Sequence, residues 1–190
     1  MSWTGFEITS EPSEEPVTAA EVKTELRLTT SAHDTMIDNK IVASRMALEG
    51  ELQRQFVTAT FKAYWSCFNN RMELPYGPVQ SITSIKYIDG AGDTQTLANT
   101  VYRLDSKSIA PWVGLEYNQS WPTARDVSNT ITIEYIAGYG AATAVPMPIK
   151  LAIIALAADL YEHPEYSPEI ALHNNTAVQK YIDRLKRVSW

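Results

Sequence analysis

The chain has 190 residues, of which 45% are apolar and 20% are charged, and its formal net charge is −6. This composition is typical of a globular protein and excludes a disordered chain, a collagen-like repeat and a coiled-coil rod. It also argues against a protein that binds nucleic acid through a general basic surface, because such binding requires clustered lysine and arginine.

The single cysteine, Cys67, cannot form an intrachain disulfide, so a disulfide scaffold is excluded and a reducing compartment is expected. Residues 1–16 contain no basic start followed by an apolar segment, which argues against a secretory signal. The longest apolar run, residues 151–158, is much shorter than the ~20 residues that cross a bilayer. We therefore expect no membrane partner.

Residues 1–16 are polar and acidic and include two prolines, so we predict a flexible or partner-ordered arm. The first helix is expected after this arm, because Thr18 and Glu21 have the spacing of a capping box. Ser31 and Asp34 repeat this spacing before a longer helix. Its predicted apolar face recurs every three or four residues, at Ile37, Ile41, Ser44, Leu48 and Leu52. Residues 17–55 should thus supply two N-terminal helices.

The period then changes to two over residues 57–67, which predicts a long strand with one buried face. Cys67 falls on the apolar face of that pattern, so we expect it to be a small buried side chain. A glycine-rich turn at residues 89–93 separates two further strands. The remaining predicted strands cover residues 82–88, 94–97, 101–104, 112–115 and 130–136. Residues 56–140 are accordingly expected to form an inserted, antiparallel, β-rich region.

The segment from Ile149 to Glu162 is apolar on nearly all sides, which is typical of a central helix. We expect it to pack against the helix at residues 34–53. A proline-bearing link through Pro168 should lead to a last helix, capped by Asn174 or Asn175. Residues 141–190 then complete an α+β fold, in which a small bundle of two N-terminal and two C-terminal helices carries the β-region.

No catalytic motif is present, and we predict no catalytic, cofactor-binding or metal-ligating residue. Asp159, Glu162 and His163 are close in sequence, and a small metal-dependent hydrolase that uses them is one alternative. His163 stands at a predicted helix end, where an imidazolium is favoured without a metal. A second alternative is a monomeric binding module with the β-region as its ligand face.

The two ends of the chain differ in charge. Residues 1–25 hold six acidic residues and one basic residue, whereas residues 178–190 hold four basic residues and one acidic residue. One interpretation is two solvated ends, with the last helix closing the core of its own subunit. The other is an interface that contacts a neighbouring subunit or a different protein. The candidate interface residues are Lys180, Tyr181, Arg184, Lys186, Arg187, Trp190 and Trp112.

Several segments occur in an order that resembles one protein family. They are EPVTAAEVKTELRL, HDTMIDNKIVASRMALE, ELPYGPVQSITSIKYIDGAGDTQTL, SWPTAR, TITIEYIAGYG and VPMPIKLAIIALAADLYEH, and together they span about residues 15–163. This order resembles the head–tail connector (adaptor) proteins of long-tailed double-stranded DNA bacteriophages.

The resemblance implies a structural virion protein without enzymatic activity or cofactor. Such proteins form a ring of roughly twelve copies beneath the portal of the capsid. The expected partners are further copies of the chain, the portal protein, a stopper or tail-completion protein, and double-stranded DNA that passes without specific binding. The expected location is the neck of the virion, assembled in the cytoplasm of the bacterial host.

Overall fold

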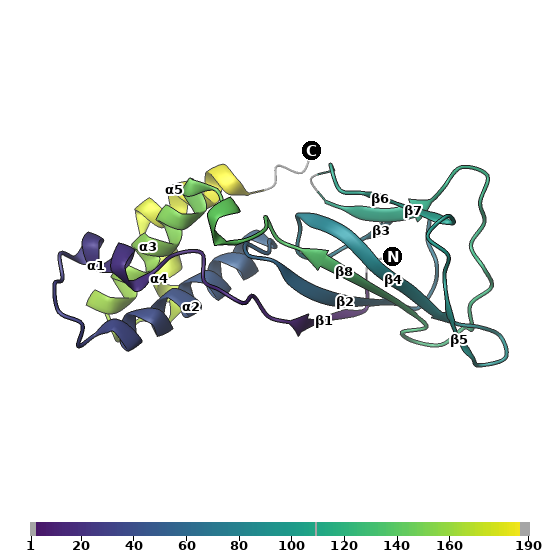
Figure 1. The fold of residues 1–190 in the computed structure, drawn as a ribbon, viewed down its shortest axis with the longest axis horizontal. Helices are drawn as coiled ribbons and strands as arrows, with labels where there is room; N and C mark the ends of the chain where they lie inside the picture. Colours follow the sequence, from purple (N-terminus) through teal and green to yellow (C-terminus); the bar gives the residue numbers. More distant parts are fainter. Residues whose placement is uncertain (1–2, 109, 187–190) are drawn as a thin grey trace. The chain divides into compact units, whose positions relative to one another are not determined.

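The computed structural model describes residues 3–108 and 110–186, and they form an α+β fold, as predicted (Figure 1). The chain divides into two compact units. Residues 3–12 and Thr58–Tyr139 form the β unit, and Ser13–Val57 and residues 140–186 form the helical unit.

The β unit contains two antiparallel sheets, whose strands are shown in Figure 1. The five-stranded sheet has the order β1-β2-β8-β4-β5, with β1 (Gly5–Ser10), β2 (Ala59–Trp65), β8 (Ile131–Ala137), β4 (Val79–Ile88) and β5 (Thr94–Thr96). The three-stranded sheet has the order β3-β7-β6, with β3 (Met72–Glu73), β7 (Trp112–Leu115) and β6 (Tyr102–Asp105).

The alternation predicted for the long strand is confirmed in β2. Its buried residues are Ala59, Phe61, Ala63 and Trp65, and the residues between them are partly exposed. Phe61 pairs with Tyr135 on β8, and their rings stack with centroids 5.4 Å apart. The prediction for Cys67 is wrong, because β2 ends at Trp65 and the Cys67 side chain is exposed. The alternation of the strand therefore stops before it reaches the cysteine.

The prediction of an arm over residues 1–16 is also wrong for Gly5–Ser10, which form the edge strand β1. Gly5 pairs with Tyr64 of β2, and the backbone N–H of Thr4 donates to the Tyr64 carbonyl across 2.8 Å. Phe6 anchors the strand, because its ring contacts both Trp3 and Tyr76. This segment is polar in sequence, but it is ordered because it pairs with the edge of β2 and because Phe6 makes these aromatic contacts.

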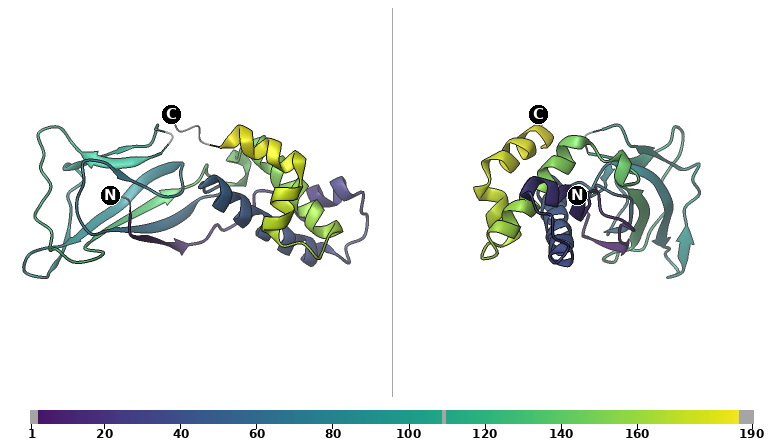
Figure 2. Two further views of the ribbon diagram at one scale, coloured as in Figure 1. Left: turned by 180° about the vertical axis from the view of Figure 1, so that it is seen from behind. Right: turned by 60° about the vertical axis from the view of Figure 1, so that its left-hand side comes forward.

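The helical unit is built around α2 and α3, which pack against each other as predicted. Figure 2 shows α4 and α5, in yellow-green and yellow, beside the green α3. The helices are α1 (Ala19–Leu26), α2 (Asp34–Leu52), the short 3-10 helix η1 (Ala142–Ala144), α3 (Met147–Glu162), α4 (Pro168–Asn174) and α5 (Thr176–Leu185).

The helix starts follow the sequence in part. The capping box of α1 is confirmed: the Thr18 N–H donates to the Glu21 carboxylate at 2.7 Å, and the Glu21 N–H donates to Thr18 Oγ1 at 3.3 Å. The predicted cap of α2 at Ser31 is wrong, because α2 begins after His33 without a side-chain cap. Asp34 instead accepts from Lys23 Nζ at 2.8 Å, which joins the last turn of α1 to the start of α2.

The C-terminal part contains three α-helices where two were predicted. Ser167 caps α4, and Pro168 occupies its first turn, where a missing N–H is tolerated. Pro168 therefore starts a helix, where a link was predicted. Asn175 caps α5, as predicted, and accepts from the N–H groups of Ala177 and Val178.

Candidate interaction surfaces

The apolar face of α5 packs inside the helical unit. Val178 and Ile182 are fully buried, and Tyr181 is partly exposed. These contacts agree with the interpretation in which the last helix closes the core of its own subunit. The side chains of α5 that remain exposed for contact with another molecule are therefore mainly the charged ones.

The basic side chains of α5 have different environments. Lys186, which follows the helix, forms an ion pair with Glu51 of α2 at 2.9 Å, and this carboxylate raises the pKa of the lysine. Lys180 and Arg184 are exposed, and neither has an ion pair with another described residue. Arg187 and Trp190, which complete the predicted interface set, lie outside the described residues. The accessible positive charge of α5 is thus carried by Lys180 and Arg184.

Trp112 lies on β7, in the other unit, and its partly exposed ring lies close to two cations. The guanidinium carbons of Arg71 and Arg103 lie 5.5 and 5.6 Å from the ring centroid. The ring also covers Gly114, where a Cβ would lie 2.3 Å from Cζ3 of the tryptophan. Tryptophan and arginine are enriched among the residues that dominate protein interfaces, so this cluster is a second candidate surface. The tryptophan is among the residues predicted from the sequence, whereas its two arginines are not.

The residues of the hydrolase alternative do not form a cluster of ligands. His163 is the C-cap residue of α3. Its Nδ1 lies 3.3 Å from a carboxylate oxygen of Glu165, and its ring stacks on that of Tyr166. Within residues 3–108 and 110–186, no group of three or more histidine, cysteine or acidic side chains is arranged to hold a metal ion. Among the described helices, none combines the length and the hydropathy of a membrane-spanning segment.

A buried charged network at the end of α2 was not anticipated. Arg45 Nη1 donates to Glu49 at 2.7 Å, and its Nε donates to Glu15 at 2.8 Å. Glu49 also accepts from Gln55 Nε2 at 2.8 Å and from the Phe56 N–H at 2.9 Å. The i,i+4 spacing of Arg45 and Glu49 beside the apolar stripe was the available sequence signal.

This network fixes two chain segments to α2. Glu15 lies in the segment that enters the helical unit, and Gln55 and Phe56 lie in the segment that leaves it. Burial is the main effect on Glu49 and raises its pKa to about 7, although the Arg45 charge acts in the opposite direction. The network is therefore a structural clamp in which the Glu49 carboxylate titrates near neutral pH.

These features define a small α+β protein whose candidate functional residues, on α5 and around Trp112, lie on the protein surface. Three solved structures share its fold over nearly the whole length. A chain from the neck of an empty gene transfer agent particle, computed with C6 symmetry, has a TM-score of 0.80 and 20% identity, covering 98% of this chain and 97% of that one. A chain from the virion of a native gene transfer agent particle has a TM-score of 0.77 and 23% identity, and the match covers 97% of this chain and 96% of that one.

The third structure is the neck of a native gene transfer agent particle computed with C12 symmetry. Its chain has a TM-score of 0.69 and 20% identity, and the match covers 98% of this chain and 97% of that one. No family model and no curated protein matches the chain. At this level of identity, the likeness establishes the fold.

Proposed function

We propose that the chain is a structural virion protein, a head–tail connector that forms a ring in the neck of a phage-like particle. The observation that carries the proposal is the shared fold over 98% of this chain and 97% of a chain from the neck of a gene transfer agent particle. The order of sequence segments that resembles phage connectors supports the same function independently. Neither argument requires an enzymatic activity or a cofactor.

The ring is proposed to lie beneath the portal and to join the DNA-filled capsid to the tail. Its partners would be further copies of the chain, the portal protein, and a stopper or tail-completion protein. The C6 and C12 symmetries of the similar neck structures support a ring of about twelve copies. In this ring, residues 17–55 and 141–190 form the bundle, and residues 56–140 form the insertion.

The charge of the chain suits a conduit for DNA. Each copy carries a net charge of −6, so twelve copies would carry about −72. A lumen with this sign of charge would repel phosphate groups and would let DNA pass without specific binding.

The exposed cations of α5 are proposed to contact the portal or a neighbouring subunit. Lys180 and Arg184 are the accessible pair in the described part of the helix, and they stand out in an acidic protein. Opposite charge on the partner would guide the approach and fix the orientation of the complex. Trp112, with Arg71 and Arg103, is the corresponding candidate in the β unit.

Electron microscopy of particles assembled with and without the chain tests this function. We expect particles without it to separate into DNA-filled heads and free tails, and added chain to restore joined particles. Joined, infectious or DNA-transferring particles in its absence would contradict the proposal. A catalytic turnover by the purified chain, dependent on Asp159, Glu162 and His163, would favour the hydrolase alternative.

A further inference from the structure

The helix α3 is apolar on two opposite faces, and its own subunit covers one of them. Ile149, Ile153, Leu156 and Leu160 are buried against the other helices. On the opposite side, Met147 is 62% exposed and Leu151 is 41% exposed. The same side continues, at helical spacing, through the partly exposed Ile154, Ala155 and Ala158. We name these five outward residues the α3 ridge.

A groove runs along α2 in the same unit. Two depressions, of ≈430 and ≈290 Å³, follow one stripe of this helix. The first is bordered by Met36, Lys40 and Ala43, and the second by Ala47, Gly50 and Glu51. Their other walls come from the end of α3, the following link and α4. We name this feature the α2 groove.

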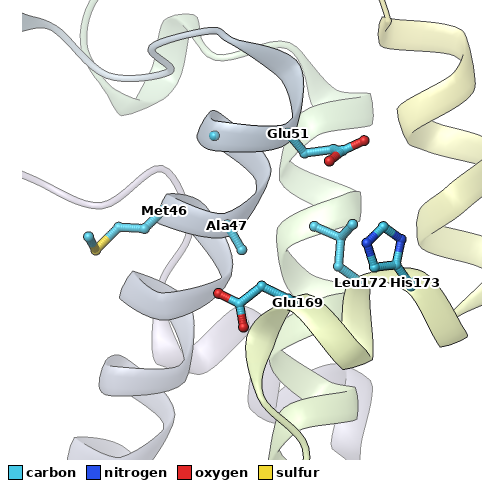
Figure 3. Close-up of a pocket in the computed structure, with 7 residues that line it drawn as sticks. Met46, Ala47, Glu51, Glu169, Leu172 and His173 are labelled. Atoms are coloured by element: carbon cyan, nitrogen blue, oxygen red, sulfur yellow. The ribbon is translucent and has the colours of Figure 1, made fainter. Parts of the chain in front are cut away.

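Figure 3 shows the second depression in detail. The Ala47 side chain points toward α4, whereas Met46 turns away from it. The Glu169 carboxylate extends from α4 toward α2, and Leu172 lies beside His173 on the same helix. The floor of the groove is thus small and apolar, and its rim carries two carboxylates, Glu51 and Glu169, and the His173 imidazole.

Gly50 gives an independent indication that the groove is occupied. It lies inside α2, where glycine lowers helix stability relative to alanine. A Cβ built on Gly50 meets no atom within 4 Å, so the subunit itself does not require a glycine there. A close approach by a second helix would require it.

We infer that the α3 ridge of one copy docks antiparallel into the α2 groove of the next copy, and this inference rests on the proposed ring. The ridge and the groove are different surfaces of one subunit, so their contact is head-to-tail and repeats around a closed ring. Apolar side chains on the ridge fill a groove with a floor of small residues, which is the complementarity that helix packing requires.

The charges at the ends of both surfaces select the antiparallel direction. Lys150 flanks the start of the ridge and Glu162 its end. The groove has Lys40 at one end and, at the other, Glu169 beside Glu51, which already pairs with Lys186 of its own subunit. Lys150 and Glu162 are separated by about 18 Å along α3, and Lys40 and Glu51 by about 16 Å along α2. The antiparallel arrangement therefore pairs opposite charges at both ends, and a parallel one pairs like charges.

Cysteine cross-linking tests this contact in the full-length chain, with Cys67→Ser as the background. In the inferred register, Ala43 faces Ala158 of the neighbouring copy. We expect the Ala43→Cys/Ala158→Cys chain to give a ladder of trimers and larger species with a short bis-maleimide. The matched control, Ala43→Cys/Met147→Cys, uses the wrong end of the same ridge and should give no ladder.

The experiment is performed both on purified chain and on particles that contain it. A ladder in either preparation supports the contact, and monomer in both overturns it. Absence of the chain from particles contradicts the proposed function only, since a ladder from purified chain would still support the contact. Monomer in both preparations, together with joined particles that contain the chain, would reject the contact and leave the connector function intact.

A substitution in the groove provides a second measurement. Gly50→Leu should lower the yield of cross-linked ladder by at least tenfold, while the melting temperature stays the same or rises. Gly90→Leu is the control, because a Cβ at Gly90 also meets nothing within 4 Å and lies in the other unit. A full ladder from the Gly50→Leu chain would overturn the inference.

Discussion

Arg45 donates to Glu49 one turn later on α2, with 2.7 Å between the guanidinium nitrogen and the carboxylate. The two residues are only 6% and 5% exposed, so this ion pair is shielded from solvent. Because Arg45 also binds Glu15, one buried cation serves two carboxylates. The network thus joins the segment that enters the helical unit before α1 to the segment that leaves it after α2.

Removal of the cation should be costly. We expect Arg45→Met to lower the free energy of unfolding by about 3–5 kcal/mol at pH 8, because it leaves Glu49 as an unpaired buried charge. Urea unfolding measures this change. Arg71→Met, which breaks the exposed pair with Glu73, is the control and should cost less than about 1 kcal/mol. Equal costs for the two variants would contradict the clamp.

Glu49 should make stability depend on pH. Burial raises its pKa in the folded chain to about 7 from an ordinary value of 4.5, so the folded state binds a proton that the unfolded state has released between these values. The contribution of Glu49 is thus fully present below pH 4.5 and is lost as the pH rises through 7.

We expect the stability of the natural chain, relative to Glu49→Gln, to fall by about 3 kcal/mol between pH 4.5 and pH 7 and to stay level above that range. Urea unfolding of both chains at several pH values measures the difference, in which the other titrating groups cancel. A difference that rises with pH would show that the attraction of Arg45 exceeds the effect of burial.

The two faces of α3 should respond differently to truncation. Leu156 is fully buried, so Leu156→Ala should lower the free energy of unfolding by about 2–5 kcal/mol. Leu151 lies on the outward face of the same helix, and Leu151→Ala should cost less than about 1 kcal/mol. A loss below half a kcal/mol for Leu156→Ala would mean that this face of α3 is not part of the core.

Gly114 should tolerate no side chain. A Cβ there would lie 2.3 Å from the Trp112 ring and 2.9 Å from the backbone oxygen of Asn70, so Gly114→Ala should cost about 1–3 kcal/mol. Gly5→Ala on β1 is the control, since its Cβ would meet nothing within 4 Å. Thermal unfolding of both variants makes the comparison, and an unchanged Gly114→Ala chain would argue against the observed ring position.

The exposed cations of α5 should affect joining more than folding. We expect the double variant Lys180→Glu/Arg184→Glu to melt near the natural temperature, because both side chains are exposed, and to lose the joining of heads to tails. Ile182→Ala on the buried face is the control and should lower the melting temperature. Normal joining by the double variant would rule out the proposed role of these charges.

Patterns that depend on neighbouring residues were predictable from the sequence. The apolar stripe of α2, the alternation in β2 and the capping box of Thr18 and Glu21 all repeat within a few residues, and each is present in the structure. The α+β class follows from them, because they place helices at both ends and strands between.

Tertiary structure alone decided the features that need distant partners. The edge strand β1 exists because Gly5 meets Tyr64, far along the chain, and the aromatic contacts of Phe6 compensate for its polar sequence. The burial of Arg45 depends on Glu15 and on the segment at Phe56, neither of which its own helix reveals. Periodicity determines which face of an element is apolar, but the packing of other segments determines whether that face is covered. For α3 one face is covered and the other is open, although both are apolar in the sequence.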